Sequence, residues 1–287
     1  MLRRPGPPFA AAALCATLLA ITGVLAKLVP ATERSDADTL DGFIGLKRPD
    51  LAPLLSHIAH LADPAPYALT ALALSVLALA RRRWRIALVV PVVFFLAGFT
   101  TEHLKHLLAH PRVQEWFGDN WIGGSSWPSG HSTAAMTMAL CAVMVAPPRL
   151  RPTVAVLGAA FAVAVAYAIL TLAWHVPSDV FGGYLVSGTW VMLAVGGLAL
   201  AERRWPSRRG ERETGRPEDL VPALVLAVGA AGVGIGLALT RPQALAGYAA
   251  EHTTFVAGAL AIAVLAMLLA TVLAFGLRGG GGRTPAR

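Results

Sequence analysis

The stretch from residue 152 to residue 201 reads PTVAVLGAAFAVAVAYAILTLAWHVPSDVFGGYLVSGTWVMLAVGGLALA. It contains two apolar runs, 152–173 and 179–201, and about 20 apolar residues are enough for a helix to cross the hydrocarbon core of a bilayer. Asp179 is the one formally charged residue of the stretch, and it stands where the second run begins. The stretch therefore predicts two membrane-spanning helices joined by a short polar turn.

The composition of the whole chain extends this prediction. Of the 287 residues, 56% are hydrophobic and 14% are charged, whereas a soluble domain has about 25% charged residues. The formal net charge is +8, and the basic residues lie in short loops between apolar runs, where they orient a membrane protein rather than bind nucleic acid. We predict a multi-pass membrane protein with no nucleic-acid partner. Eight spans are expected, at residues 8–29, 66–81, 86–108, 131–147, 152–173, 179–201, 220–239 and 253–277.

The orientation of the chain follows from its basic loops. Placing Arg3 and Arg4 inside puts most of the 24 Lys and Arg residues on the inner side of the membrane. With eight spans, both termini are then cytoplasmic. The alternative is that the first run is a cleaved signal peptide, because Val24-Leu25-Ala26 resembles a cleavage site. The Ala-, Arg- and Pro-rich usage indicates a bacterial genome, and we expect the protein in the plasma membrane.

The fold class predicted is an all-α membrane helix bundle in three parts. Residues 1–201 are expected to form a six-helix core. Residues 202–219 are polar and basic and contain two prolines, which is typical of a cytoplasmic linker. Residues 220–287 are expected to hold two additional transmembrane helices and a glycine-rich tail. The protein partners and the oligomeric state are left open.

Two finer features of these parts are also predicted. In residues 31–65, apolar side chains recur at mostly helical spacing, which favours an amphipathic helix lying on the outer membrane surface. In the seventh span, Gly232 and Gly236 form a small-xxx-small pair, which predicts close packing against another helix.

The first of three polar clusters on the outer side carries two cations. Lys105 and Arg112 stand seven residues apart, two helical turns, at the end of the third span. A lysine provides a point charge and an arginine a bidentate fork, so the pair suits a phosphate group. The alternative is that both side chains reach along the interface to water.

Three histidines near this cluster allow a different interpretation. His103, His106 and His110 fall on one helical face with Glu102 nearby, a set of ligands that zinc accepts. The two cations point away from that face, and we predict no metal and no cofactor.

The second cluster opens the fourth span. Ser129, Gly130 and His131 follow Pro128 directly before an apolar run, as at the start of a helix. Free backbone N–H groups at a helix start attract an anion, and a histidine there can donate a proton to a leaving oxygen. The alternative is an ordinary capped helix with an interfacial histidine.

The third cluster is Trp174-His175-Val176-Pro177-Ser178-Asp179. His175 and Asp179 are four residues apart and can meet on one side of a first helical turn. A carboxylate bonded to one ring nitrogen fixes the tautomer and leaves the other nitrogen as a base or nucleophile. The alternative is a capping aspartate with an unrelated histidine.

In order and spacing, the three clusters resemble the signature of the type 2 phosphatidic acid phosphatases, the lipid phosphate phosphatases related to vanadium haloperoxidases. Their pattern is K-x6-R-P, P-S-G-H and S-R-x5-H-x3-D, and the resemblance covers roughly residues 30–200. Two departures are present. Val113 stands in place of the proline after the first arginine, and Ile169 stands where the third motif has an arginine that binds phosphate.

The resemblance implies a metal-independent phosphohydrolase with an outward-facing site. His175 is implied to attack phosphorus and form a phosphohistidine, Asp179 to orient it, and His131 to protonate the leaving oxygen. The residues implied to hold the phosphoryl oxygens are Lys105, Arg112, Ser129 and the backbone N–H of Gly130.

The sequence leaves three functions open. The first is hydrolysis of a lipid phosphate, such as phosphatidic acid, phosphatidylglycerophosphate or a polyprenyl pyrophosphate of envelope synthesis. The second is a catalytically weakened relative that binds or transports a lipid phosphate, which Ile169 favours. The third is an unrelated transporter. Such a protein would carry polar residues near its span midpoints, whereas here they gather at span ends.

Overall fold

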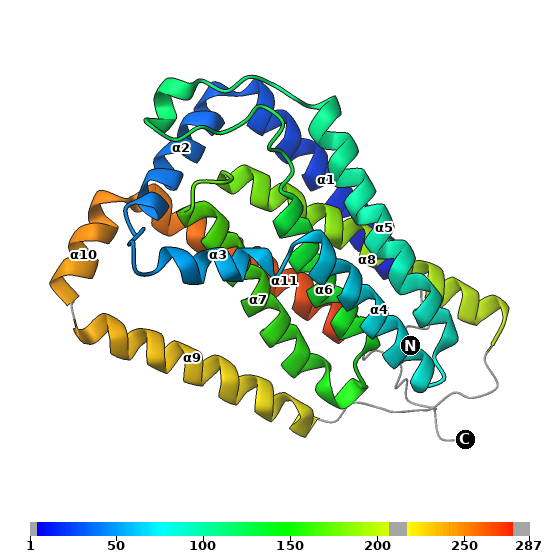
Figure 1. Cartoon of the computed structure of the whole chain (residues 1–287). Helices are drawn as coiled ribbons and strands as arrows, with labels where there is room; N and C mark the ends of the chain where they lie inside the picture. The colour runs from blue at the N-terminus through cyan, green and yellow to red at the C-terminus, as the bar shows by residue number, and fades with distance from the viewer. Residues whose placement is uncertain (1–4, 207–216, 241, 278–287) are drawn as a thin grey trace.

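The computed structural model describes residues 5–206, 217–240 and 242–277, and all its regular elements in these ranges are helical, which confirms the predicted all-α class. Figure 1 shows the arrangement. The α-helices are α1 (Gly6–Leu28), α2 (Pro30–Ile44), α3 (Ala52–His60), α4 (Pro64–Ala80), α5 (Trp84–Leu107), α6 (Gly130–Val145), α7 (Arg151–Thr171), α8 (Pro177–Arg204), α9 (Val221–Thr240), α10 (Pro242–Glu251) and α11 (Thr253–Gly276).

Each predicted span coincides with a helix, and several helices are long and apolar enough to cross a membrane. Within the described residues these are α1, α5, α7, α8 and α11. Helices α3 and α4 pass the same test as a pair bent by 47°, which explains why the predicted second span is short. The prediction of a multi-pass membrane protein is confirmed.

The centre of the bundle is α6. Its sequence, GHSTAAMTMALCAVMV, is made of small and apolar residues all round, and nearly all of its side chains are buried. A helix that is apolar on every face belongs inside a bundle. It packs against α4, α5, α7, α8 and α11, while α1 packs along α8. The polar residues at the start of α6 are therefore held at the end of the central helix.

The last helices take different places. Helix α11 packs against α7, α6 and α8 through a buried face that includes Ile262, Ala266 and Leu269. Helix α9 lies along one side of the bundle (Figure 1), and an added Cβ at Gly232 would meet nothing within 4 Å. Among the residues that the structure describes, the close packing predicted at Gly232 is therefore not found. The surroundings of Gly236 lie outside the described residues, as do residues 207–216 of the predicted linker and 278–287 of the tail.

The outer segment 31–65 differs from the single surface helix that was predicted. It forms α2 and α3, and the apolar face of α2 packs on the bundle. Leu40 and Phe43 are buried, and the Phe43 ring meets the rings of Tyr167 on α7 and Phe255 on α11. Burying this face against protein removes its apolar surface from water without a membrane.

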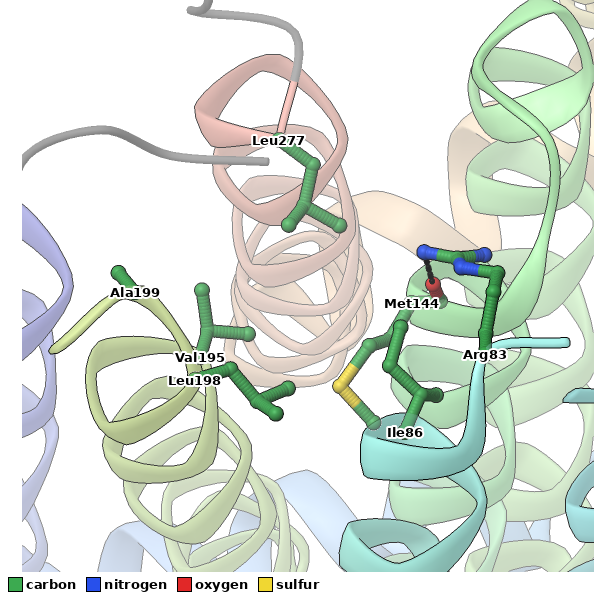
Figure 2. Close-up of a pocket in the computed structure, with 7 residues that line it drawn as sticks. All are labelled: Arg83, Ile86, Met144, Val195, Leu198, Ala199 and Leu277. Carbon is green, nitrogen blue, oxygen red and sulfur yellow. Dashed lines mark hydrogen bonds between the residues drawn. The ribbon is translucent and has the colours of Figure 1, made fainter. Parts of the chain in front are cut away.

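One end of the bundle is closed by arginines, and we call it the arginine end (residues 81–85, 145–151 and 199–206). Arg83 donates to the carbonyl oxygens of Val145 and Met144 at the end of α6, and Arg151 donates to the carbonyl of Leu277 after α11. Cations are stabilised at helix C-termini by the free carbonyls and the helix dipole. Figure 2 shows Arg83 beside a small apolar pocket between α5, α6, α8 and α11.

Candidate active site

The polar clusters meet at the other end of the bundle, which we call the loop end (residues 108–129, 172–176 and the helix termini beside them). The segment before α6 lies against the start of α8, where Ser129 N–H donates to the Asp179 carbonyl at 2.9 Å. An added Cβ at Gly183 would lie 2.7 Å from the Ser129 carbonyl oxygen. No side chain fits there, so a glycine on α8 is what allows the two helix starts to approach.

His175 and Asp179 form the hydrogen-bonded pair that their spacing predicts. The His175 Nδ1 lies 3.2 Å from Asp179 Oδ2, which also accepts the Val176 N–H at 3.2 Å. A carboxylate only accepts, so Nδ1 carries the hydrogen and Nε2 keeps its lone pair. The Asp179 side chain is fully buried, and that of His175 is 12% exposed. The geometry leaves Nε2 of His175 as the available nucleophile.

Arg112 binds the other oxygen of the same carboxylate. Its Nη2 lies 2.8 Å from Asp179 Oδ1 and 2.9 Å from Ser126 Oγ, and the side chain is 2% exposed. Its Nε and Nη1 are buried and have no hydrogen-bond partner among the residues that the structure describes. Buried donors without partners are costly unless a ligand uses them. Arg112 thus offers two donor nitrogens, Nε and Nη1, to an anion next to the His175–Asp179 pair.

The start of α6 completes a cationic cradle. Ser129 caps the helix by accepting the Ser132 N–H, and an added Cβ at Gly130 would lie 3.3 Å from Lys105 Nζ. The ammonium of Lys105 therefore lies over the first turn, where helical N–H groups and the dipole also favour an anion. Lys105 is paired with Glu102 at 2.8 Å, but the Glu102 side chain is 59% exposed, so this pair is weak.

His131 lies beside His175, with 6.3 Å between the ring centroids. Its Nε2 lies 3.2 Å from Asp63 Oδ1, and the other oxygen of Asp63 lies 2.9 Å from His60 Nδ1. The centroid of the Trp174 ring lies 5.6 Å from that of His131 and 5.7 Å from that of His60. Asp63 lies in the turn between α3 and α4, His60 is the last residue of α3, and neither was predicted as a site residue.

A second unpredicted carboxylate supports α8 from α2. Asp36 is buried and accepts from both the Ser178 N–H and the Ser178 hydroxyl. The pKa of Asp36 is raised to about 7, first by burial and also by the nearby Asp179, while the Ser178 bonds and Arg112 act in the opposite direction. A signal was present in the sequence, since Asp36 stands four residues before Leu40 on the face that carries apolar residues.

The structure also shows the surroundings of Ile169 and of His103. Ile169 is fully buried in the apolar core, so its position supplies no phosphate ligand. In the described part of the chain, no three His, Cys, Asp or Glu side chains gather closely enough to hold a metal. His103, from the zinc alternative, stacks on Phe99 and contacts the Phe99 carbonyl.

Comparison with known proteins bears on the family resemblance and on the fold. Residues 86–205 match the model of the PAP2 superfamily, which confirms the resemblance seen in the motifs. No curated protein sequence matches the chain. Among solved structures, the chain is similar to a transmembrane PAP2 type phosphatidylglycerolphosphate phosphatase from Bacillus subtilis, with a TM-score of 0.50 and 19% identity. The match covers 70% of this chain and 99% of that one, and it shows a shared fold.

Proposed function

We propose that this chain, whose residues 86–205 match the PAP2 superfamily, is a membrane-embedded phosphatase of lipid phosphates with its active site at the loop end. One observation carries the proposal: Arg112 is buried beside the His175–Asp179 pair, and its Nε and Nη1 are used by no group in the described part of the chain. Fixed donors of this kind stabilise charge that develops on phosphoryl oxygens. Lys105, Ser129 and the Gly130 N–H are proposed to share the phosphoryl group.

In the first step, His175 Nε2 attacks phosphorus and the bond to the leaving oxygen breaks. The leaving oxygen takes the electron pair of that bond and a proton from His131. Asp179 stabilises the positive charge that forms on the His175 ring. In the second step, His131 accepts a proton from water as the water attacks phosphorus, and the P–N electron pair returns to His175. The sequence of steps requires no metal and no cofactor.

The substrate is proposed to be a phosphomonoester or pyrophosphate of a lipid. Phosphatidic acid, phosphatidylglycerophosphate and polyprenyl pyrophosphate present the same terminal phosphate to this cradle, and the bacterial composition favours the polyprenyl carrier of envelope synthesis. We propose that the loop end faces outward. The arginine end then faces the cytoplasm, together with both chain termini, as basic residues do in bacterial plasma membranes.

The test is phosphate release from these three lipids by the purified chain in detergent. The proposal expects release from at least one lipid, lost in His175→Ala. The matched control is His103→Ala, since His103 contacts Phe99 and none of the residues proposed to act. Equal release by the chain and by His175→Ala would refute the mechanism.

The second candidate is a weakened relative that binds or transports a lipid phosphate. The buried Ile169 favours it, because one donor missing from a phosphate clamp typically costs on the order of 10²–10³ in rate. This candidate expects that the chain retains a lipid phosphate in a binding assay and releases no phosphate from any of the three lipids.

A further inference from the structure

We propose that Asp63 is a positioning residue for His131, and that the turn between α3 and α4 thereby sets the acid–base half of the reaction. The inference rests on the proposed function. Asp63 uses both carboxylate oxygens on histidines, Oδ1 toward His131 Nε2 at 3.2 Å and Oδ2 toward His60 Nδ1 at 2.9 Å. It lies outside the residues that match the superfamily, in a turn 68 residues before His131.

The hydrogen-bond chemistry fixes the tautomer of His131. The Asp63 carboxylate is an acceptor, so Nε2 of His131 carries a hydrogen in both the neutral and the charged ring. Nδ1 is then the nitrogen that gains and loses the catalytic proton. In the first step Nδ1–H gives its proton to the leaving oxygen, and in the second step Nδ1 takes one from water. Nε2–H stays on Asp63 throughout.

The surroundings of His131 show why an anion at this position matters. Burial disfavours a charged His131 ring most, and His175, from the turn before α8, and Lys105, from α5, disfavour it as well. Asp63 is the carboxylate that opposes them. The Trp174 ring, 5.6 Å away, adds an aromatic face on which a charged imidazole is also favoured.

The carboxylate of Asp63 does not cap α4. Asp63 is the N-cap residue of α4, but its side chain accepts no capping hydrogen bond. It is 37% exposed, and its partner His60 is 56% exposed. Replacing an exposed aspartate that makes no cap has a small effect on stability. Asp63→Asn therefore tests positioning with little damage to the bundle.

The experiment compares two leaving groups, using the full chain in detergent. Phosphatidic acid releases an alcohol, which needs a proton to depart, whereas p-nitrophenyl phosphate releases a stable phenolate, which does not. We expect Asp63→Asn to lower kcat/KM for phosphatidic acid on the order of 10–100-fold and to lower it less than three-fold for p-nitrophenyl phosphate. Asp63→Glu should restore part of the loss, and Asp50→Asn, at another exposed aspartate of the outer segment, should change neither value.

The pH profile gives a second readout that a structural role would not move. Without the carboxylate the charged form of His131 is disfavoured, so the alkaline limb for phosphatidic acid should move to lower pH. The inhibition constant of inorganic phosphate should stay unchanged, since Asp63 lies outside the cradle. An equal loss on both substrates, or no loss on phosphatidic acid, would overturn the role of Asp63. An unmodified chain inactive on both substrates would instead refute the proposed function, and the inference with it.

Discussion

Two histidine–carboxylate pairs meet at the loop end, and they are built differently. In each pair a ring nitrogen lies 3.2 Å from a carboxylate oxygen. Asp179 is fully buried and also binds the buried Arg112, whereas Asp63 is 37% exposed and its second partner is the exposed His60. Because water screens charges at a surface much more than in an interior, the same contact has a larger energetic effect in the buried pair.

The difference separates two tasks. The nucleophile needs one fixed orientation, and a buried, fully bonded carboxylate four residues along the same helix start provides it. The acid must be charged in one step and neutral in the next, and a partly exposed carboxylate from another helix stabilises the charge without locking it. Substitutions in each pair should therefore have different effects on activity and on stability.

The largest expected effect is on the nucleophile. His175→Ala removes the group proposed to bond phosphorus, and we expect a loss on the order of 10⁴-fold or more in phosphate release. His131→Ala keeps the nucleophile and should lose about 10²–10³-fold with a lipid substrate. Rapid quenching with radiolabelled substrate should then show an acid-labile phosphoenzyme in His131→Ala and none in His175→Ala. A phosphoenzyme in His175→Ala would reverse the assignment of the two rings.

The next effect compares the two carboxylates directly. Asp179→Asn should lower the rate by about 10³-fold, because the amide can hold the wrong tautomer of His175. It should also lower the melting temperature, since it leaves the Arg112 charge buried without its anion. Asp63→Asn should lose less activity and keep its melting temperature. The two melting temperatures, measured in detergent, decide the point, and equal values would mean that burial does not distinguish the pairs.

A smaller effect is expected where the buried pair meets the phosphate. Arg112→Lys keeps the charge but replaces the planar fork by a single nitrogen, so it cannot bind Asp179 through one nitrogen and present two others to a phosphate. We expect about 10²-fold loss in kcat/KM, with a raised inhibition constant for inorganic phosphate. Ser126→Ala is the matched control, because the Ser126 hydroxyl accepts a hydrogen bond from the same Arg112 Nη2 and is not among the residues of the proposed cradle. A loss in the control as large as that in Arg112→Lys would show that kcat/KM depends on keeping the guanidinium in place rather than on its bidentate geometry.

The parts that sequence predicts well are those with local causes. The spans follow from runs of apolar residues, as in α7 and α8, and the His175–Asp179 contact follows from the four-residue spacing at one helix start. The seven residues of the predicted site lie together at the loop end, which is what their place at span ends on one side implies. Their proposed roles stay predictions.

The parts that sequence misses depend on contacts between distant segments. Asp63 contacts His131 because the chain bends by 47° between α3 and α4, at the turn that contains Asp63. The sequence around Asp63 does not indicate the direction of this bend. The segment 31–65 gave a helical pattern, but the pattern could not tell a membrane surface from the side of a bundle as the partner of its apolar face. Leu40 and Phe43 meet helices far along the chain, so their partner is fixed by tertiary packing.

The smallest effect concerns Asp36, the carboxylate that supports the start of α8. Burial raises its pKa from 3.8 to about 7, so the folded chain keeps a proton that the unfolded chain releases between about pH 4 and pH 7. Stability from this group is therefore fully present below about pH 4, falls as the pH rises toward 7, and is constant above it.

Asp36→Asn mimics the protonated side chain, since its Oδ1 can accept the Ser178 N–H and its Nδ2 can donate to the Ser178 hydroxyl. The melting temperature of Asp36→Asn, minus that of the unmodified chain, should rise across pH 4.5–7 and then level off, whereas Asp38→Asn, at an exposed position of the same helix, should give a flat difference. Parallel curves for Asp36→Asn would mean that Asp36 is charged throughout, and that the start of α8 is held by an anion from α2 just as His175 is held by Asp179 from the first turn of α8.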